Sequence, residues 1–158
     1  METILVTGAV GFIGIHVCAL LLDKGYRVVG VDNLNDYYPV SVKEENRDRL
    51  AANPLFVFYH ADILDTTLLE QIFSTEKPAR VIHLGARAGV RPSLQDPQLY
   101  ADVNIRGTLN LLDLAYHHRV ARFVFGSSSS VYGLNAAVPF SEDDDVTNQA
   151  SPYGVSKR

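Results

Sequence analysis

The sequence predicts an α/β fold, a doubly wound parallel sheet with helices on both faces. Short apolar runs alternate with longer stretches of helical period, which is the pattern of strands joined by crossover helices. A glycine-rich loop, Gly8–Gly14, lies between the first apolar run and the first helical stretch. The length of 158 residues and the hydrophobic share of 47% suit one compact domain with a buried core.

Each predicted strand is a short run rich in β-branched, aromatic and other apolar residues. These runs are Thr3–Val6, Arg27–Val31, Leu55–His60, Arg80–His83 and Arg122–Phe125. Right-handed crossovers, with the glycine loop after the first strand, give the strand order 3-2-1-4-5. The expected architecture is therefore a Rossmann-like sheet that stops before its later strands.

Four helices are expected between these strands. They are Phe12–Lys24, Ser41–Ala51, Thr66–Ser74 and Leu99–His118. Gly25 follows Lys24, where a helix C-terminal glycine is common, and Pro54 and Pro78 precede strands. These residues support the predicted helix ends.

Charge and cysteine content exclude several classes of partner. A net charge of −4 gives no electrostatic reason to bind nucleic acid or an acidic membrane. No apolar run approaches the ~20 residues of a membrane span, and the N-terminus lacks a basic leader, so we expect a cytoplasmic protein. Cys18 is the single cysteine, which rules out an intrachain disulfide, and its apolar helical setting favours a buried packing thiol over a reactive one.

The glycine loop is the first candidate binding site. Gly8, Gly11 and Gly14 are spaced three apart, with Phe12 and Ile13 between the last two. Glycine permits a tight turn and lets backbone N–H groups approach a dinucleotide pyrophosphate at the start of a helix. The third glycine would allow helix and strand to pack closely. The loop therefore predicts a nicotinamide dinucleotide site.

Asp32 ends the second predicted strand, where a carboxylate can accept hydrogen bonds from both adenosine-ribose hydroxyls. The same charge would repel a 2′-phosphate, which favours NAD over NADP. The neighbouring Asn33 belongs to the same candidate site. The alternative is a turn or helix N-cap aspartate in the polar segment Asp32–Asp36.

The fourth predicted strand ends in small residues that would let the backbone pass close to a flat cofactor, although a plain tight loop remains an alternative. The candidate residues are Leu84, Gly85, Ala86 and Arg87. His83 precedes them within an apolar run and is interpreted as a buried, hydrogen-bonded histidine and not as a base or metal ligand. No spacing of His, Cys or carboxylate residues indicates a metal site.

A hydroxyl cluster follows the fifth predicted strand, at the sheet edge where ligands bind in open α/β folds. Ser128 lies in this cluster, and Tyr153 and Lys157 follow it along the chain. A serine that binds the reacting oxygen, a tyrosinate that takes its proton and a lysine that favours the phenolate form one acid/base device. Taken singly, each is also compatible with a serine-rich turn, an interfacial tyrosine or a solvated lysine.

These motifs together resemble the N-terminal half of an extended short-chain dehydrogenase/reductase of the NAD-dependent epimerase/dehydratase family. The resemblance runs from Thr3 to Lys157 and is closest to the UDP-glucuronate 4-epimerases. The segments that carry this closer likeness are Asp32–Tyr38, Ala88–Arg91, Ser127–Gly133 and Pro139–Asp143.

The resemblance implies NAD as cofactor, with Ser128 as the hydroxyl partner that binds substrate. Tyr153 is expected to be the acid/base and to contact the cofactor, and Lys157 is expected to bind the nicotinamide ribose. The resemblance also implies that Asp62 and Ile63 contact adenine. Two further residues, Ser129 and Ser130, would contact the substrate. Related 4,6-dehydratases usually carry Asp-Glu at this pair, because elimination needs an extra carboxyl group. The serines therefore favour reversible oxidation at C4 of a UDP-sugar, which gives epimerisation.

Asn104 matches an asparagine that stabilises a distortion of the family's long central helix, and it is expected at the cofactor site unless it is merely an exposed helical asparagine. Family members often form homodimers through this helix and the helix that carries the tyrosine. The family usually has Ala-Ala-Gln where this chain has Gly85-Ala86-Arg87, so Arg87 could meet a cofactor phosphate or solvent.

Family members are longer than this chain, and their C-terminal part supplies the last strands and most of the sugar-nucleotide pocket. We therefore expect residues 1–158 to form an incomplete NAD-binding Rossmann domain without the substrate domain. Such a chain should bind NAD but turn over little substrate alone. A non-catalytic NAD-binding module, or a dehydratase or reductase of the same superfamily, is the alternative.

Overall fold

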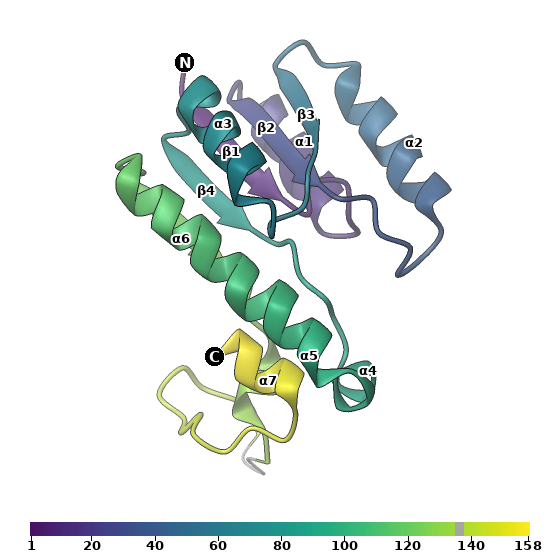
Figure 1. Ribbon diagram of the computed structural model, residues 1–158, viewed down its shortest axis with the longest axis vertical. Helices are drawn as coiled ribbons and strands as arrows, with labels where there is room; N and C mark the ends of the chain where they lie inside the picture. Colours follow the sequence, from purple (N-terminus) through teal and green to yellow (C-terminus); the bar gives the residue numbers. More distant parts are fainter. Residues whose placement is uncertain (135–137) are drawn as a thin grey trace.

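A computed structural model describes residues 1–134 and 138–158 and contains a five-stranded sheet (Figure 1). The strands are β1 (Thr3–Thr7), β2 (Arg27–Asp32), β3 (Phe56–His60), β4 (Arg80–His83) and β5 (Arg122–Phe125). All neighbouring pairs are parallel and the order is β3-β2-β1-β4-β5. The predicted α/β class and strand order are confirmed, and strand ends differ from the prediction by one residue at most.

Helices cover both faces of the sheet (Figure 1). The α-helices are α1 (Gly14–Asp23), α2 (Val40–Ala51), α3 (Thr66–Glu76), α4 (Val90–Gln95), α5 (Pro97–Tyr100), α6 (Gly107–His117) and α7 (Pro152–Lys157). A π-helical turn, η1 (Ala101–Arg106), joins α5 to α6, and a 3-10 turn, η2 (Ser129–Tyr132), follows β5. No helix in the described ranges is long and apolar enough to cross a membrane.

Alternation along the strands builds two hydrophobic cores. On one face, Leu5 and Val29 pack with apolar residues of α3 and α6. On the other face, Ile4 and Val28 pack with α1 and α2. Because successive strand residues point to opposite faces, β1 to β4 contribute to both cores. The edge strand β5 contributes Phe123 to the first core, and its Val124 on the other face is 53% exposed.

Cys18 belongs to the second core and is completely buried. Its Sγ lies 3.7 Å from the carbonyl oxygen of Ala9. Burial, with a smaller contribution from Asp32, raises the pKa of the thiol to about 12. The interpretation of Cys18 as a packing residue agrees with this setting, because a thiol that stays protonated is a poor nucleophile.

Helix ends follow local capping chemistry. The Asp65 side chain accepts a hydrogen bond from the N–H of Leu68 and begins α3. The Ser151 side chain accepts from the N–H of Gly154 and begins α7, whose first residue is Pro152. Gly25, predicted to end the first helix, has φ +81°.

The predicted helix Leu99–His118 is helical without a gap as far as His117, but residues Ala101–Arg106 form a π-helical turn between α5 and α6, which the prediction of an ordinary helix did not include. Asn104 within the turn uses its side chain to bind the backbone of Arg87. The hydroxyl of Thr108 bonds the carbonyl oxygen of Asn104 at 2.5 Å. The apolar pattern predicts a helix but does not distinguish a π turn within it, so the pattern alone did not reveal the turn.

The first helix begins at Gly14 and not at the predicted Phe12. The preceding turn is closed by a hydrogen bond from the N–H of Gly11 to the oxygen of Gly8. Gly8 has φ +65°, and a Cβ on it would lie 2.8 Å from the N atom of Gly85. A Cβ on Gly14 would lie 2.0 Å from the oxygen of Gly8. The loop is thus packed backbone against backbone.

Gly14→Ala should lower the free energy of unfolding by about 3 kcal/mol, because the added methyl overlaps a backbone carbonyl that has no room to move. Urea denaturation followed by circular dichroism measures this loss.

Gly25→Ala is the matched control, since a Cβ there meets nothing within 4 Å although its φ is positive. It should cost only about 1 kcal/mol of backbone strain. Equal losses for the two variants would contradict the steric explanation.

Candidate active site

A cavity of about 430 Å³ opens beside the carboxyl ends of the strands and brings most of the predicted site residues together. The predicted residues that line it are Gly8, Gly11, Phe12, Ile13, Gly14, Asp32, Asn33, Ile63, Leu84, Gly85, Ala86, Tyr153 and Lys157. The glycine loop, the end of β2 and helix α7 therefore face one space, although they lie far apart in the sequence.

Three predicted cofactor residues, Asp62, Arg87 and Asn104, do not line the cavity but contact residues close to it. Asp62 accepts a hydrogen bond from the side chain of Asn33 at 2.8 Å, so it holds a lining residue. Asn104 holds the Arg87 backbone through bonds of 2.8 and 2.9 Å. The Arg87 guanidinium lies over the ring of Tyr37, 5.9 Å from its centroid. Direct cofactor contact by these residues stays a prediction.

The serine cluster is arranged differently from the prediction. Ser127, which was not singled out, lines the cavity and donates to the carbonyl oxygen of Lys157 at 2.7 Å. Ser128 begins the 3-10 turn, and its Oγ accepts from the N–H of Ser130 at 3.2 Å. Ser128, Ser129 and Ser130 do not line this cavity. Their proposed roles concern substrate and are not tested by this geometry.

Lys157 is 5% exposed and is held by polar and aromatic contacts. Its Nζ donates to the carbonyl oxygen of Gly126 at 2.9 Å and lies 4.8 Å from the centroid of the Phe125 ring. Burial lowers the pKa of its ammonium from 10.5 to about 8. The site therefore keeps a buried cation beside Tyr153, which favours negative charge in the cavity.

Tyr153 is fixed by contacts outside its own helix. Its N–H donates to the Oγ of Ser93 at 3.2 Å. Its ring packs edge-on against Tyr100, with centroids 6.1 Å apart. The Tyr100 hydroxyl in turn bonds the Ala88 carbonyl oxygen at 2.5 Å. The loop after β4 thus supports the phenol from one side.

Asp32 lies at the opposite end of the cavity and is 7% exposed. Its Oδ1 accepts from the N–H of Leu34 at 2.9 Å, so it forms the turn weighed as an alternative and also faces the cavity. The Nζ of Lys43 lies 3.9 Å from the same oxygen. Burial lowers the pKa of Lys43, and the nearby Asp32 charge partly offsets that effect.

Sequence reasoning missed several residues that line the cavity. They are Val31, Asn35, Tyr37, Tyr38, Lys43, Ala61, Ala88, Val103, Gly126 and Ser127. Most lie next to a predicted residue and could have been found by extending each motif. Lys43 carried no such signal, because it reaches the site from α2 and reads as an ordinary helical lysine.

The cavity fits a dinucleotide. Gly8, Gly14 and Gly85 leave no space for side chains, so the loop can present backbone N–H groups to a phosphate. The Tyr38 hydroxyl is buried beside Gly11 and near the backbone N–H of Phe12, and its proton meets no acceptor among the described residues. Burial, chiefly, raises the pKa of Tyr38, so it remains a protonated donor. A ligand oxygen at this point would satisfy it.

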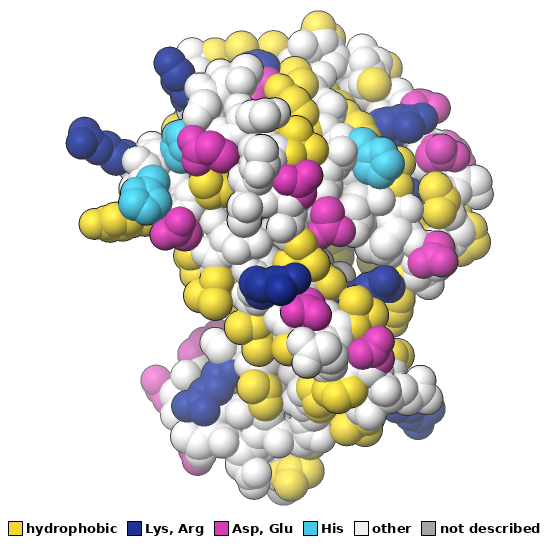
Figure 2. Space-filling view, viewed as in Figure 1, with side chains coloured by type: hydrophobic (Ala, Val, Ile, Leu, Met, Phe, Trp, Pro, Cys, Tyr) yellow, Lys and Arg dark blue, Asp and Glu magenta, His cyan; other side chains and the backbone are white. Residues whose placement is uncertain are grey.

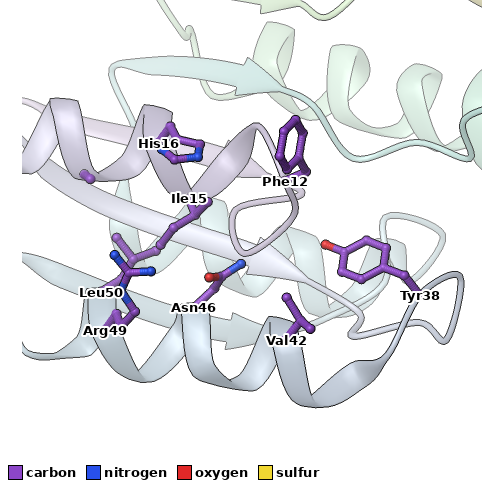
Figure 3. A pocket seen from close by; sticks show the side chains of 9 residues that line it. Phe12, Ile15, His16, Tyr38, Val42, Asn46, Arg49 and Leu50 are labelled. Atoms are coloured by element: carbon purple, nitrogen blue, oxygen red, sulfur yellow. The ribbon is translucent and has the colours of Figure 1, made fainter.

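A larger cavity of about 570 Å³ lies between α1 and α2, on the other side of Phe12 and Tyr38 (Figure 3). Its remaining lining is mostly apolar, and Asn46 at its wall donates to the carbonyl oxygen of Val10 at 2.9 Å. None of the predicted catalytic residues reaches it. The smaller cavity, and not the larger one, is lined by the predicted acid/base residues Tyr153 and Lys157.

The comparisons with known proteins agree with this geometry. Residues 5–158 match the family model described as GDP-mannose 4,6 dehydratase. The UDP-glucuronate 4-epimerase of Thermodesulfobacterium geofontis is 47% identical over 154 residues, which cover 98% of this chain and 47% of that protein. UDP-glucuronate 4-epimerase 4 of Arabidopsis thaliana is 44% identical, over 99% of this chain and 36% of its own length.

Solved structures show the same fold. UDP-glucuronic acid 4-epimerase of Bacillus cereus, in complex with UDP-glucuronic acid and NAD, aligns with a TM-score of 0.89 and 40% identity. UDP-glucose 4-epimerase of Bifidobacterium longum, in complex with NAD⁺ and UDP, aligns with a TM-score of 0.88 and 36% identity. Each alignment covers 99% of this chain, but only 49% and 46% of those chains.

The chain thus spans about half the length of the relatives that it matches. The family match itself covers nearly all of the present residues, including the glycine loop and α7. The chain belongs to the GDP-mannose 4,6 dehydratase family of NAD-dependent epimerases and dehydratases.

Proposed function

We propose that this chain is the NAD-binding part of a UDP-sugar 4-epimerase, with UDP-glucuronate as substrate. One observation carries the proposal: Tyr153 and Lys157 share a cavity with the glycine loop and Asp32. An acid/base pair beside a dinucleotide cradle is the arrangement that hydride chemistry on a hydroxyl carbon needs. The relatives' names supply the substrate class.

Different residues would bind different parts of the cofactor. The backbone of Gly11 to Gly14 would hold the pyrophosphate, and Asp32 would accept the adenosine-ribose hydroxyls. Bound NAD would accept hydride from the sugar carbon and return it, which leaves no net redox change. The negative charge of Asp32 disfavours a 2′-phosphate. The Nζ of Lys43, 3.9 Å from Asp32 Oδ1, reduces this repulsion.

Tyr153 is the proposed acid/base. It removes the proton of the C4 hydroxyl as the sugar is oxidised. It returns a proton after the 4-keto sugar has rotated to present its other face to the cofactor. Lys157 supplies positive charge that stabilises the phenolate, and Gly126 fixes the ammonium through a 2.9 Å hydrogen bond. Ser128 is proposed to bind the reacting oxygen once substrate is present.

The absence of a second acid favours epimerisation over dehydration. Elimination of water requires an additional carboxyl group near the sugar. Among the described residues that line the cavity, Asp32 is the single carboxylate, and it lies at the end opposite Tyr153. Ser129 and Ser130 occupy the sequence positions where a dehydratase carries Asp and Glu. The two serines therefore favour epimerisation over dehydration.

We also propose that the protein is cytoplasmic, and that residues beyond this span, which the relatives possess, complete the sugar pocket.

We further propose that the protein acts as a homodimer. Four apolar residues of η1 and α6 follow the spacing i, i+4, i+7, i+11 of one helical face. They are Ile105, Leu109, Leu112 and Tyr116, which are 42%, 59%, 43% and 80% exposed. Figure 2 shows hydrophobic side chains at the surface where α6 and α7 lie. Such a stripe is typical of helix pairing.

Calorimetric titration of the chain should show binding of NAD⁺, with NADP⁺ as the control that binds more weakly. Tyr153→Phe should leave NAD⁺ binding unchanged, because the phenol oxygen acts on substrate. In a chimera that adds the second half of a UDP-glucuronate 4-epimerase, the same change should reduce turnover at least ~100-fold.

Three outcomes would contradict this function. They are a wild-type chain that does not bind NAD⁺, a Tyr153→Phe chimera that keeps full turnover, and a reaction that releases NADH stoichiometrically. The second outcome would favour a non-catalytic NAD-binding module, and the third a dehydrogenase. High turnover by the isolated chain would contradict the proposed need for further residues.

Lys157 should titrate near pH 8 in NMR spectra of lysine labelled at Cε, because burial destabilises its ammonium. Between about pH 8 and 10.5 the unfolded chain then binds more protons than the folded chain. This group should therefore make stability rise with pH in that window. Lys157→Met should flatten the rise, and a wild-type value near 10.5 would contradict the burial argument.

Leu109→Glu should convert a dimer into a monomer in light scattering at tens of micromolar protein, because it places a charge in the apolar stripe. Leu20→Glu is the matched control: Leu20 on α1 is 57% exposed, against 59% for Leu109. A wild-type chain that stays monomeric, or equal effects of both changes, would exclude this interface.

A further inference from the structure

We propose that His83 is a positioning residue. A series of hydrogen bonds, all with the same donor-to-acceptor direction, passes through His83 and connects the glycine loop (Gly8–Gly14) to α7, the helix that carries Tyr153. The inference rests on the proposed function and assigns His83 a role that the acid/base mechanism does not use. His83 ends β4, is 1% exposed and lies between the rings of Phe123 and Phe125, at centroid distances of 6.0 and 5.8 Å.

His83 is a neutral imidazole in this setting. Burial, with a smaller contribution from the Lys157 charge, lowers its pKa to about 3. A neutral ring has one N–H donor and one nitrogen acceptor, and the partners decide which nitrogen carries the proton. His83 therefore adds no second cation beside Lys157.

The partners determine the tautomer. Thr108 Oγ1 lies 2.5 Å from the carbonyl oxygen of Asn104, which can only accept, so the Thr108 hydroxyl donates there. Thr108 Oγ1, 2.9 Å from His83 Nε2, must then accept the ring proton. His83 Nδ1 is left as the acceptor for the hydroxyl of Thr7 at 2.6 Å. Thr7 Oγ1 also accepts from the N–H of Gly85 at 3.0 Å.

One end of this series of hydrogen bonds fixes the glycine loop. Thr7 directly precedes Gly8, and Gly85 is the residue whose N atom would lie 2.8 Å from a Cβ on Gly8. The two bonds of Thr7, to His83 and from Gly85, set this close approach between the loops after β1 and β4. Loss of the imidazole would release the first of them and leave the Thr7 hydroxyl without its acceptor.

The other end reaches the catalytic helix. The side-chain Nδ2 of Asn104, whose carbonyl oxygen receives the Thr108 hydroxyl, donates to Ser156 Oγ at 3.0 Å. Ser156 Oγ donates to the carbonyl oxygen of Tyr153 at 2.8 Å. The sequence Thr7, His83, Thr108, Asn104, Ser156 thus connects the glycine loop to Tyr153. Each member is satisfied, so removing the central ring leaves buried polar groups unpaired on both sides.

The test uses the chain as it is, with two variants. His83→Phe keeps a ring of similar size without hydrogen bonds, and Thr108→Val removes the two bonds of the Thr108 hydroxyl and keeps the shape. Both should weaken NAD⁺ binding in calorimetry, His83→Phe by at least about tenfold, or ~1.4 kcal/mol. Both should also shift the NMR resonance of Tyr153 Cζ in the ligand-free chain. His83→Gln, which can donate and accept, should recover part of the affinity.

Phe123→Leu is the matched control, because it removes a ring that packs against His83 but breaks none of these hydrogen bonds. It should lower stability while leaving the NAD⁺ affinity and the Tyr153 resonance as in the wild type. Imidazole ¹⁵N shifts of the wild type should show the proton on Nε2.

A proton on Nδ1, or a His83→Phe chain with unchanged NAD⁺ affinity and Tyr153 resonance, would overturn the proposal. If His83→Phe does not fold, Thr108→Val decides by the same two measurements. The Tyr153 resonance and the tautomer are read without cofactor. A wild-type chain that fails to bind NAD⁺ would therefore overturn the proposed function, while these two readouts would still decide on the coupling.

Discussion

The site depends on the close approach of two backbone segments, the loop after β1 and the loop after β4. A Cβ on Gly8 would lie 2.8 Å from the N atom of Gly85, and one on Gly14 would lie 2.0 Å from the oxygen of Gly8. This contact is possible only because neither segment carries side chains there. It sets where α1 begins, and it sets the floor of the cavity that Asp32 and Lys157 also line. Loops of other composition would separate β1 from β4 at their carboxyl ends and widen that floor.

Periodicity and glycine spacing predicted the sheet, its order and most of the cavity lining, because those signals are local. The π-helical turn within the predicted helix Leu99–His118 was not a local signal, since it is accompanied by bonds from Asn104 to Arg87, a residue of a distant loop. Lys43 was missed for a related reason. It lies on α2, and only the fold brings its Nζ to 3.9 Å from Asp32. The resemblance pointed to a distortion at Asn104, which residue patterns alone did not.

The charged residues of the cavity lie in two places, Lys157 beside Tyr153 and the pair Asp32 and Lys43 at the other end. Lys157 is the buried cation next to Tyr153, and desolvation already destabilises it, which lowers its pKa to about 8. A second cation nearby would lower that pKa further and favour loss of the Lys157 proton. The neutral state of His83, whose pKa falls to about 3, is consistent with this requirement. At the far end, Asp32 and Lys43 offset each other. The net positive field is therefore concentrated beside Tyr153, the proposed acid/base.

The first turns of α7, which carry Tyr153, are held by tertiary contacts, and most of these contacts are polar. Ser151 caps the helix, Ser93 and Asn104 bind it from the side, and Ser127 binds the carbonyl of Lys157. Hydrogen bonds have narrow angular ranges, so several of them orient a short helix more sharply than apolar packing does. The hydroxyl-rich composition of this part of the sequence is thus a requirement of precise placement of Tyr153, in addition to any contact that serines make with substrate.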